Sequence, residues 1–192
     1  RQTLPILSNI LIKKVGTRVE FTATDLDIEI KTFADIGADG PDTCVTVDAA
    51  KLQSLISALN HGSEVTLSQQ SENDPTVELK QGKSTFRLNT LPAEEFPNRQ
   101  ATSFAQTLVI PANQLRHLLQ LVHFSMAQQD IRYFLNGMLM SVEGDTVRVV
   151  TTDGHRLAYC ESKLEAPIAD TIQCIVPRRT VLEMIRLIPD NE

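Results

Sequence analysis

The segment TLPILSNILIKKVGTRVEFTATD at residues 3–25 recurs as IRYFLNGMLMSVEGDTVRVVTTD at residues 131–153, at an offset of 128 residues and without a gap. A second block, which contains Val47 and again Val176 and opens a helix, recurs at an offset of 129. Two blocks at nearly the same offset indicate a duplicated unit. The pairs of identical residues are Leu7 and Leu135, Leu11 and Leu139, Gly16 and Gly144, Val19 and Val147, and Thr24-Asp25 and Thr152-Asp153.

The hydrophobic pattern of the first half predicts strands and one helix. Period-2 alternation predicts a hairpin that turns at Gly16-Thr17. Asp48 is expected to cap a helix whose buried face carries Leu52, Leu55, Ile56 and Leu59, because these residues follow the spacing i, i+3, i+4, i+7. The other expected strands are Ile28–Phe33, Cys44–Val47, Glu64–Ser68, Thr76–Leu79 and Ser84–Leu88.

The second half follows the same order after a segment of its own. We expect a strand at Leu108–Ile110 and a helix that starts near Pro111. Cys174–Pro177 is expected to open a further helix. Three strands are expected between these helices, near Asn136–Val142, Thr146–Thr152 and Arg156–Ser162. Each copy is therefore predicted to be an α+β unit of helices and antiparallel strands.

Residues 91–103 contain two prolines and no hydrophobic period, so they form the predicted linker. This places a first unit at 1–103 and a second unit at 104–192. The first unit lacks the strand and helix that precede the shared block in the second, and the second stops soon after its last helix. Both units are therefore expected to be incomplete.

Composition excludes several classes of protein. Of the 192 residues, 42% are hydrophobic and 22% are charged, which suits a globular chain and excludes disorder over the whole length. No apolar run approaches the ~20 residues that span a membrane, and no signal peptide is expected. Three cysteines without metal-ligand spacing argue against a zinc site and fit a reducing cytoplasm. Because the net charge is −6, any contact with DNA must come from a local basic patch.

After the shared Thr-Asp pair the two copies diverge. Strand alternation predicts that Ile28 and Ile30 point inward and that Asp27 and Glu29 point outward. Leu157 occupies the place of Glu29, so an apolar side chain is expected at a solvent-facing position, as in a protein-binding patch. The alternative is a local bulge that returns Leu157 to the core.

The most enzyme-like cluster is Asp153-Gly154-His155-Arg156. Asp and His can perform acid–base chemistry on a positioned substrate, so a small α+β enzyme that uses Asp153 and His155 is the alternative function. The chain has no GxSxG, no glycine-rich phosphate loop and no HExxH. Asp25, the counterpart of Asp153, is followed by neither His nor Arg, which favours a turn role for both aspartates.

A group of arginines suggests contact with a polyanion. Arg178 and Arg179 are expected in the first turn of a helix, where the macrodipole disfavours cations by ~0.3–1 kcal/mol. Backbone N–H groups at such a helix start can also hold phosphate. The group comprises Arg1, Arg132, Arg178 and Arg179.

Four runs of residues closely resemble the beta subunit of bacterial DNA polymerase III, the sliding clamp, and the resemblance covers the whole chain. Members of this family have three like units per subunit, each of antiparallel sheets with two helices. Two subunits close head to tail into a ring around duplex DNA, with the helices lining the hole. This chain corresponds to the first two units, and the third is absent. The four runs are Thr3–Asn9, Thr90–Pro97, Phe124–Gly137 and Thr151–Ala158.

The resemblance implies a processivity factor that tethers the replicative polymerase and docks the clamp loader and other DNA-processing proteins. It implies no catalytic site, cofactor or metal, and DNA binding without sequence specificity. It further implies a homodimer in the full-length protein and a cytoplasmic location. A ring holds DNA by its topology, so a few arginines on an acidic body suffice for weak contacts with the phosphates.

The resemblance also assigns residues to three surfaces. Phe134 stands where many members have Tyr, which removes a hydroxyl group from the DNA-facing set. The ring interface corresponds to the strand Ser84–Leu88, with Lys83 and Phe86 among its contacts. The DNA-facing positions are Arg1, Gln129, Tyr133, Phe134, Arg178 and Arg179. The part of the partner-peptide pocket that this chain contains is Leu135, Thr152, Gly154, His155, Arg156 and Leu157.

Overall fold

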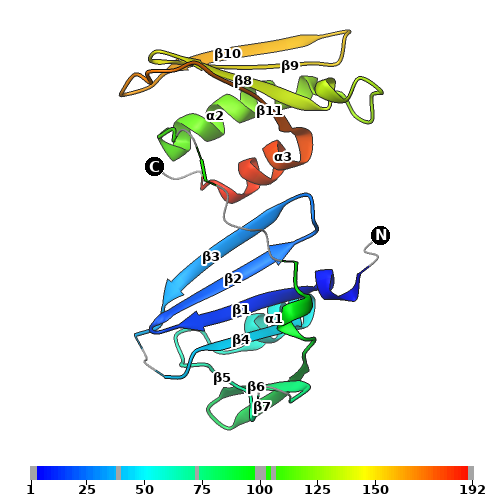
Figure 1. Cartoon of the computed structure of the whole chain (residues 1–192), viewed down its shortest axis with the longest axis vertical. Helices are drawn as coiled ribbons and strands as arrows, with labels where there is room; N and C mark the ends of the chain where they lie inside the picture. The colour runs from blue at the N-terminus through cyan, green and yellow to red at the C-terminus, as the bar shows by residue number, and fades with distance from the viewer. Residues whose placement is uncertain (1–3, 38–39, 72–73, 98–102, 105–106, 190–192) are drawn as a thin grey trace. The chain divides into compact units, whose positions relative to one another are not determined.

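The computed structural model divides the chain into two compact units, residues 1–102 and residues 103–192 (Figure 1). Each unit combines antiparallel strands with helices and has its own hydrophobic core, which is the α+β class expected from the sequence. The residues that the structure describes are 4–37, 40–71, 74–97, 103–104 and 107–189.

The first unit contains two antiparallel sheets. Its elements are η1 (Pro5–Ser8), β1 (Asn9–Val15), β2 (Arg18–Thr24), β3 (Glu29–Asp35), β4 (Thr43–Asp48), α1 (Ala49–Ala58), β5 (Thr66–Ser68), β6 (Thr76–Gln81), β7 (Ser84–Asn89) and η2 (Ala93–Glu95). The larger sheet has the strand order β3-β2-β1-β4, and the smaller has the order β5-β6-β7. The predicted hairpin is confirmed, since β1 and β2 pair on either side of Gly16.

α1 begins where the sequence predicts it. The Asp48 carboxylate accepts a hydrogen bond from the backbone N–H of Lys51 at 2.8 Å, which caps the helix. Leu52 is buried in the core of the first unit, and Leu55 packs partly against that core. Ile56, which was expected on the same buried face, is exposed. The described part of the unit therefore covers a narrower stripe of α1 than the spacing of its apolar residues predicts.

The second unit places its helices on one face of a single four-stranded sheet (Figure 1). Its elements are α2 (Ala112–Val122), η3 (His123–Ser125), η4 (Tyr133–Leu135), β8 (Gly137–Glu143), β9 (Thr146–Thr152), β10 (Leu157–Lys163), β11 (Ile172–Pro177) and α3 (Arg178–Leu187). The strand order is β10-β9-β8-β11. Leu119 of α2 and Val181 of α3 are fully buried against Met138 and Val149 of the sheet. Burial of these side chains supplies the main apolar stabilisation of the unit.

The structure confirms the repeat. β8, β9 and β10 have the bounds of β1, β2 and β3 displaced by 128 residues, and β11 and α3 have those of β4 and α1 displaced by 129. The strand orders of the two larger sheets correspond in the same way. α2 has no counterpart among the described residues of the first unit.

One predicted element of the second unit is wrong, and one strand was not predicted. Leu108–Ile110 forms no strand, although Leu108 and Ile110 pack against the core and Val109 is exposed. The alternation is therefore real, but no neighbouring strand among the described residues pairs with it. The last helix starts at Arg178, which confirms that Arg178 and Arg179 lie in its first turn, but Cys174–Pro177 belongs to a strand, β11, which pairs with β8.

The predicted linker is partly ordered structure of the first unit. The backbone N–H of Leu91 donates to the hydroxyl oxygen of Thr46, and that hydroxyl donates to the carbonyl of Leu91. Phe96 is buried in a small cluster with Ile6 and Leu7. Residues 91–97 therefore pack on the first unit, while residues 98–102 lie outside the described part of the chain.

The expected inward position of Ile30 is also wrong. Ile30 is 39% exposed, whereas the side chain of Glu29 is only 17% exposed and pairs with Lys31 at 3.3 Å. β3 is an edge strand, and every residue after Glu29 in it is exposed. Alternation predicts burial only where a neighbouring layer covers one face of the strand, and β3 has little such cover among the described residues.

The repeat generates a prediction about strain at one turn. Leu26 has φ of 79°, and Gly154, the residue at the same place in the second unit, has φ of 88°. A leucine in this region is strained by ~1–2 kcal/mol, whereas glycine adopts it freely. Leu26→Gly should therefore raise the free energy of unfolding by about 1 kcal/mol, measured by chemical denaturation. Gly154→Ala is the reciprocal control and should lower it. A loss of stability in Leu26→Gly would contradict the strain argument.

Candidate functional site

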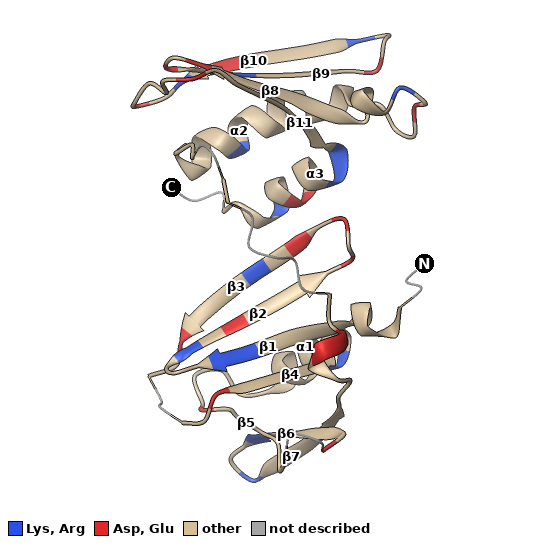
Figure 2. Cartoon of the chain, in the orientation of Figure 1, with Lys and Arg blue, Asp and Glu red and all other residues tan. Residues whose placement is uncertain are grey.

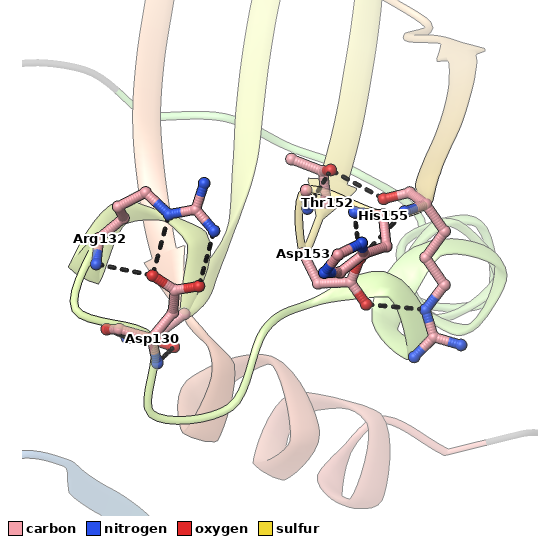
Figure 3. A network of polar contacts seen from close by, with 8 residues as sticks. Asp130, Arg132, Thr152, Asp153 and His155 are labelled. Carbon is pink, nitrogen blue, oxygen red and sulfur yellow. Dashed lines mark hydrogen bonds and ion pairs between the residues drawn. The ribbon is translucent and has the colours of Figure 1, made fainter.

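The candidate site is centred on the turn between β9 and β10, which side-chain oxygens hold in place (Figure 3). The Thr152 hydroxyl accepts from the backbone N–H of Gly154 at 3.1 Å and donates to the carbonyl of Arg156 at 2.7 Å. One Asp153 carboxylate oxygen accepts from the backbone N–H groups of His155 and Arg156, both at 3.0 Å. These bonds fix the turn while Gly154, His155 and Arg156 stay exposed.

The first unit has the same network. The Thr24 hydroxyl accepts from the backbone N–H of Leu26 and donates to the carbonyl of Ile28. The Asp25 carboxylate accepts from the backbone N–H groups of Asp27 and Ile28. The turn role predicted for both aspartates is therefore what the structure contains.

This arrangement leaves Asp153 poorly suited to catalysis. The N–H groups of His155 and Arg156, with the Arg156 guanidinium 3.0 Å from the carboxylate, lower the pKa of Asp153 below its ordinary value. In the part of the chain that the structure describes, no hydrogen bond joins the Asp153 carboxylate to the His155 imidazole. An acid–base pair of Asp153 and His155 is therefore not formed.

A second charged group lies beside the turn, on the segment 128–136 (Figure 3). The Asp130 carboxylate accepts two hydrogen bonds from the Arg132 guanidinium, at 2.9 and 3.0 Å, and one from the Arg132 backbone N–H at 2.8 Å. This pairing lowers the pKa of Asp130 to about 2. A Cβ atom added to Gly154 would lie 3.4 Å from Nη2 of Arg132, so the guanidinium lies beside Gly154.

The sequence grouped Arg132 with arginines that meet a polyanion, and the structure gives it a different setting. Its charge is matched by Asp130, and its side chain lies against the turn that carries the expected pocket residues. Sequence spacing could not reveal this contact, because Arg132 and Gly154 are far apart in the chain.

Apolar side chains are exposed around this turn. Leu157 starts β10 and is 64% exposed, so it does not return to the core. Leu157 and Glu29 occupy equivalent places, because Leu157 pairs with Thr152 and Glu29 pairs with Thr24. Glu29 was expected to face solvent, but its side chain is mostly covered. Phe124, to which the sequence assigned no role, is also exposed. The Cζ atom of Arg156 lies over its ring, 5.8 Å from the ring centre.

Leu135 differs from the other expected pocket residues. It is only 9% exposed, so most of its side chain is packed inside the second unit. Thr152 is half-buried, and its hydroxyl is occupied by the turn. The exposed members of the expected set are therefore Gly154, His155, Arg156 and Leu157.

The expected DNA-facing residues of the second unit come from two neighbouring segments. Gln129 is exposed with φ of 56°, and the exposed rings of Tyr133 and Phe134 meet edge to face, 6.0 Å apart. Arg178 and Arg179 start α3, and the backbone N–H of Arg178 donates to the carbonyl of Asn136 at 2.9 Å. The start of α3 is thus bonded to the end of η4. Arg1 lies outside the described residues.

The two expected interface residues belong to the first unit. Lys83 is exposed in the turn between β6 and β7, and Phe86 is half-buried on β7, opposite Leu79. β7 lies at one edge of its three-stranded sheet, so its outer backbone groups have no strand partner among the described residues. Edge strands of this kind can pair with a second chain.

The described residues offer neither a metal site nor a membrane-spanning helix. They contain no group of three or more His, Cys, Asp or Glu side chains that could hold a metal ion. None of the described helices is long and apolar enough to cross a membrane.

Comparisons with known proteins match both units. Residues 1–100 match the family model of the N-terminal domain of the DNA polymerase III beta subunit, and residues 109–192 match that of its central domain. The chain belongs to the DNA polymerase III beta-subunit family. Beta sliding clamps from Pseudomonas putida and Escherichia coli are 38% and 36% identical to it, over all of this chain and 52% and 51% of their own lengths. The chain thus spans about half the length of the curated relatives it matches.

Solved structures of this family agree with the fold. The crystal structure of the DNA polymerase III subunit beta from Pseudomonas aeruginosa superposes with a TM-score of 0.92 at 38% identity. It covers 98% of this chain, while this chain covers 50% of it. The crystal structure of a DNA polymerase sliding clamp from Caulobacter crescentus superposes with a TM-score of 0.86 at 36% identity. The superposition covers 98% of this chain and 51% of the Caulobacter chain.

The Asp130–Arg132 pair allows a test of the site's electrostatics. Arg132→Ala should raise the pKa of Asp130 from about 2 toward its ordinary value of 3.8, because the hydrogen bonds from the Arg132 guanidinium lower this pKa more than any other contact does. The pair stabilises the fold above the ordinary pKa, and this contribution is lost as the pH falls toward 2. NMR titration of the Asp130 carboxyl carbon measures the shift. Lys163→Ala, which removes the partner of Asp145, should leave the pKa of Asp130 unchanged.

Proposed function

We propose that the chain forms the first two units of a sliding clamp, which encircles duplex DNA and tethers the replicative polymerase for processive synthesis. The observation that carries the proposal is the placement of charge. The chain has a net charge of −6, yet the three α-helices among its described residues carry five Lys or Arg residues and one Glu. Figure 2 shows where these charges lie. These residues are Lys51 of α1, Arg116 of α2, and Arg178, Arg179, Glu183 and Arg186 of α3.

This charge placement suits helices that face DNA in a ring. Duplex DNA carries about one negative charge per 1.7 Å of its axis, so a strongly basic lining would hold the phosphates and stop sliding. A few basic side chains on helices of an acidic protein permit contacts that form and break quickly. Such contacts reach phosphates and carry no sequence information. A protein in this role works in the bacterial cytoplasm, where the DNA is.

The turn between β9 and β10 fits the role of a docking site for partner proteins. Leu157 and Phe124 offer exposed apolar surface, and Gly154 exposes backbone without a side chain of its own. A short peptide with apolar anchors matches this chemistry. Polymerase and clamp-loader subunits would bind here through such peptides, and a third unit would complete the pocket.

Closure of the ring is proposed to use β7. An edge strand with Lys83 and Phe86 beside it can pair with a strand of a second subunit, which gives a homodimer in the full-length protein. Catalysis by Asp153 and His155 receives no support, because the turn occupies the Asp153 carboxylate. The proposed protein is a processivity factor without chemistry, cofactor or metal of its own.

The arginines at the start of α3 test the DNA contact. Arg178→Ala combined with Arg179→Ala should lower the affinity for duplex DNA to a similar degree for all sequences. It should also flatten the salt dependence by a slope of about one per lost phosphate contact. Fluorescence anisotropy across a salt series measures both. A control with the same change of charge, Lys31→Ala with Arg148→Ala on strands β3 and β9, should have little effect. A loss that depended strongly on DNA sequence would argue for base readout and against a clamp.

Leu157 tests the docking site. Leu157→Ala should change the free energy of unfolding by less than about 1 kcal/mol, because the side chain is largely exposed. It should weaken binding of a peptide from the polymerase tail about tenfold or more, since a central anchor contributes more than ~1–2 kcal/mol. Calorimetry on the full-length protein measures both quantities. Leu187→Ala removes a similarly exposed leucine at the end of α3 and should leave peptide affinity intact. A large loss of stability with unchanged affinity would assign Leu157 to the core.

A further inference from the structure

The two candidate surfaces of the second unit share one short segment. Gln129, Tyr133 and Phe134 belong to the set expected to face DNA. Arg132 comes from the same segment and lies beside Gly154 in the turn between β9 and β10, which we call the partner turn. The segment is closed on itself by hydrogen bonds between residues 130 and 136. What holds this segment therefore determines the geometry of both surfaces.

Asn136 makes the bonds that close the segment. Its side-chain oxygen accepts from the backbone N–H of Asp130 at 2.9 Å, and its side-chain nitrogen donates to the carbonyl of Asp130 at 2.8 Å. Its own backbone N–H donates to the carbonyl of Tyr133 at 3.0 Å, and its carbonyl accepts from the N–H of Arg178. Asn136 is thus bonded to both DNA-facing segments and to Asp130.

From Asp130 the contacts continue to the partner turn. The Asp130 carboxylate holds the Arg132 guanidinium with two hydrogen bonds, and that guanidinium lies beside Gly154. Tyr133 and Arg178 are thus joined to Asn136, and the Asn136 amide is joined to Asp130, which holds Arg132. Hydrogen bonds join Asn136 to Asp130 and Asp130 to Arg132, whose guanidinium lies beside Gly154. The Asp130–Arg132 group and the turn are seen together in Figure 3.

The first unit has no amide side chain at the place of Asn136. At the displacement of 128 residues, Asn136 corresponds to Ser8, Arg132 to Leu4 and Gly154 to Leu26. The strands and the turn nevertheless have the same bounds and the same turn hydrogen bonds in both units. The two units therefore differ in the side chains at these three places, and the second unit carries both candidate surfaces.

We propose that Asn136 is a positioning residue that couples DNA contact to peptide binding in the second unit. A duplex against Tyr133, Phe134 and Arg178 favours the bonded arrangement of the segment, in which Asp130 holds Arg132 beside Gly154, and this is the arrangement that a peptide entering at Gly154 binds. Binding of either ligand therefore tightens binding of the other, by the same factor because the linkage is reciprocal. This inference rests on the function proposed above.

The test measures the coupling on the full-length protein. The dissociation constant of a labelled peptide from the polymerase tail is determined by fluorescence anisotropy, with and without a saturating short duplex. We expect the duplex to tighten the peptide about fivefold, the lower end of typical coupling between sites. Asn136→Ala should reduce this factor to about one. Asn136→Asp keeps an acceptor for the backbone N–H of Asp130 but loses the donor to the Asp130 carbonyl. It should give an intermediate coupling factor, and it replaces Asn136→Ala as the test variant if Asn136→Ala does not fold.

A matched control exists in the first unit. The side-chain amide of Gln81 makes the same two bonds to the backbone N–H and carbonyl of Asn60, both at 3.0 Å. Gln81→Ala should keep the full coupling factor, which separates a positioning role from a general loss of stability. The proposal is overturned if both ligands bind without coupling, if Asn136→Ala keeps the coupling, or if Gln81→Ala abolishes it. If neither ligand binds, the proposed function fails, and this inference fails with it.

Discussion

A carboxylate that accepts two backbone N–H groups at the end of a strand is the interaction on which both units depend. Asp25 and Asp153 each bind the N–H groups two and three residues ahead, and the preceding threonine closes the same turn from the other side. The turn sets the register of the following strand, so that Glu29 and Leu157 occupy equivalent places. Because the backbone is held from within, the residues at the tip of the turn are free to differ between the units.

In the second unit, the residues at this turn form an exposed surface. Gly154 and Leu157 replace Leu26 and Glu29, which removes one side chain and adds an exposed apolar one on an unchanged backbone. Arg132 lies beside the turn, and the Asp130 carboxylate neutralises its charge. Duplication followed by such replacements separates the requirements of the fold from those of the site.

Acidic and basic residues are also distributed unequally between the sheets and the helices. The strands and turns carry most of the acidic residues, while the three α-helices carry basic ones with a single glutamate. Within the sheets, acidic residues pair with neighbouring basic ones, as Glu143 and Glu161 do with Arg148. Exposed pairs of this kind contribute little stability, so their effect is mainly to neutralise the cations of the sheet. The net basic character is left on the helices.

Most of the fold was readable from the residues alone, because strand alternation, helix spacing, the Asp48 cap and the repeat are local or periodic signals. The hairpins, α1 and the turn role of the two aspartates follow from them. Long-range packing settled the rest: Ile30 is exposed since β3 lies at a sheet edge, Cys174–Pro177 is a strand since β8 pairs with it, and Phe96 fastens the expected linker to the first unit. The contact of Arg132 with Gly154 and the Asn136 bridge likewise depend on backbone positions that no spacing in the sequence encodes, because they join segments through the folded chain.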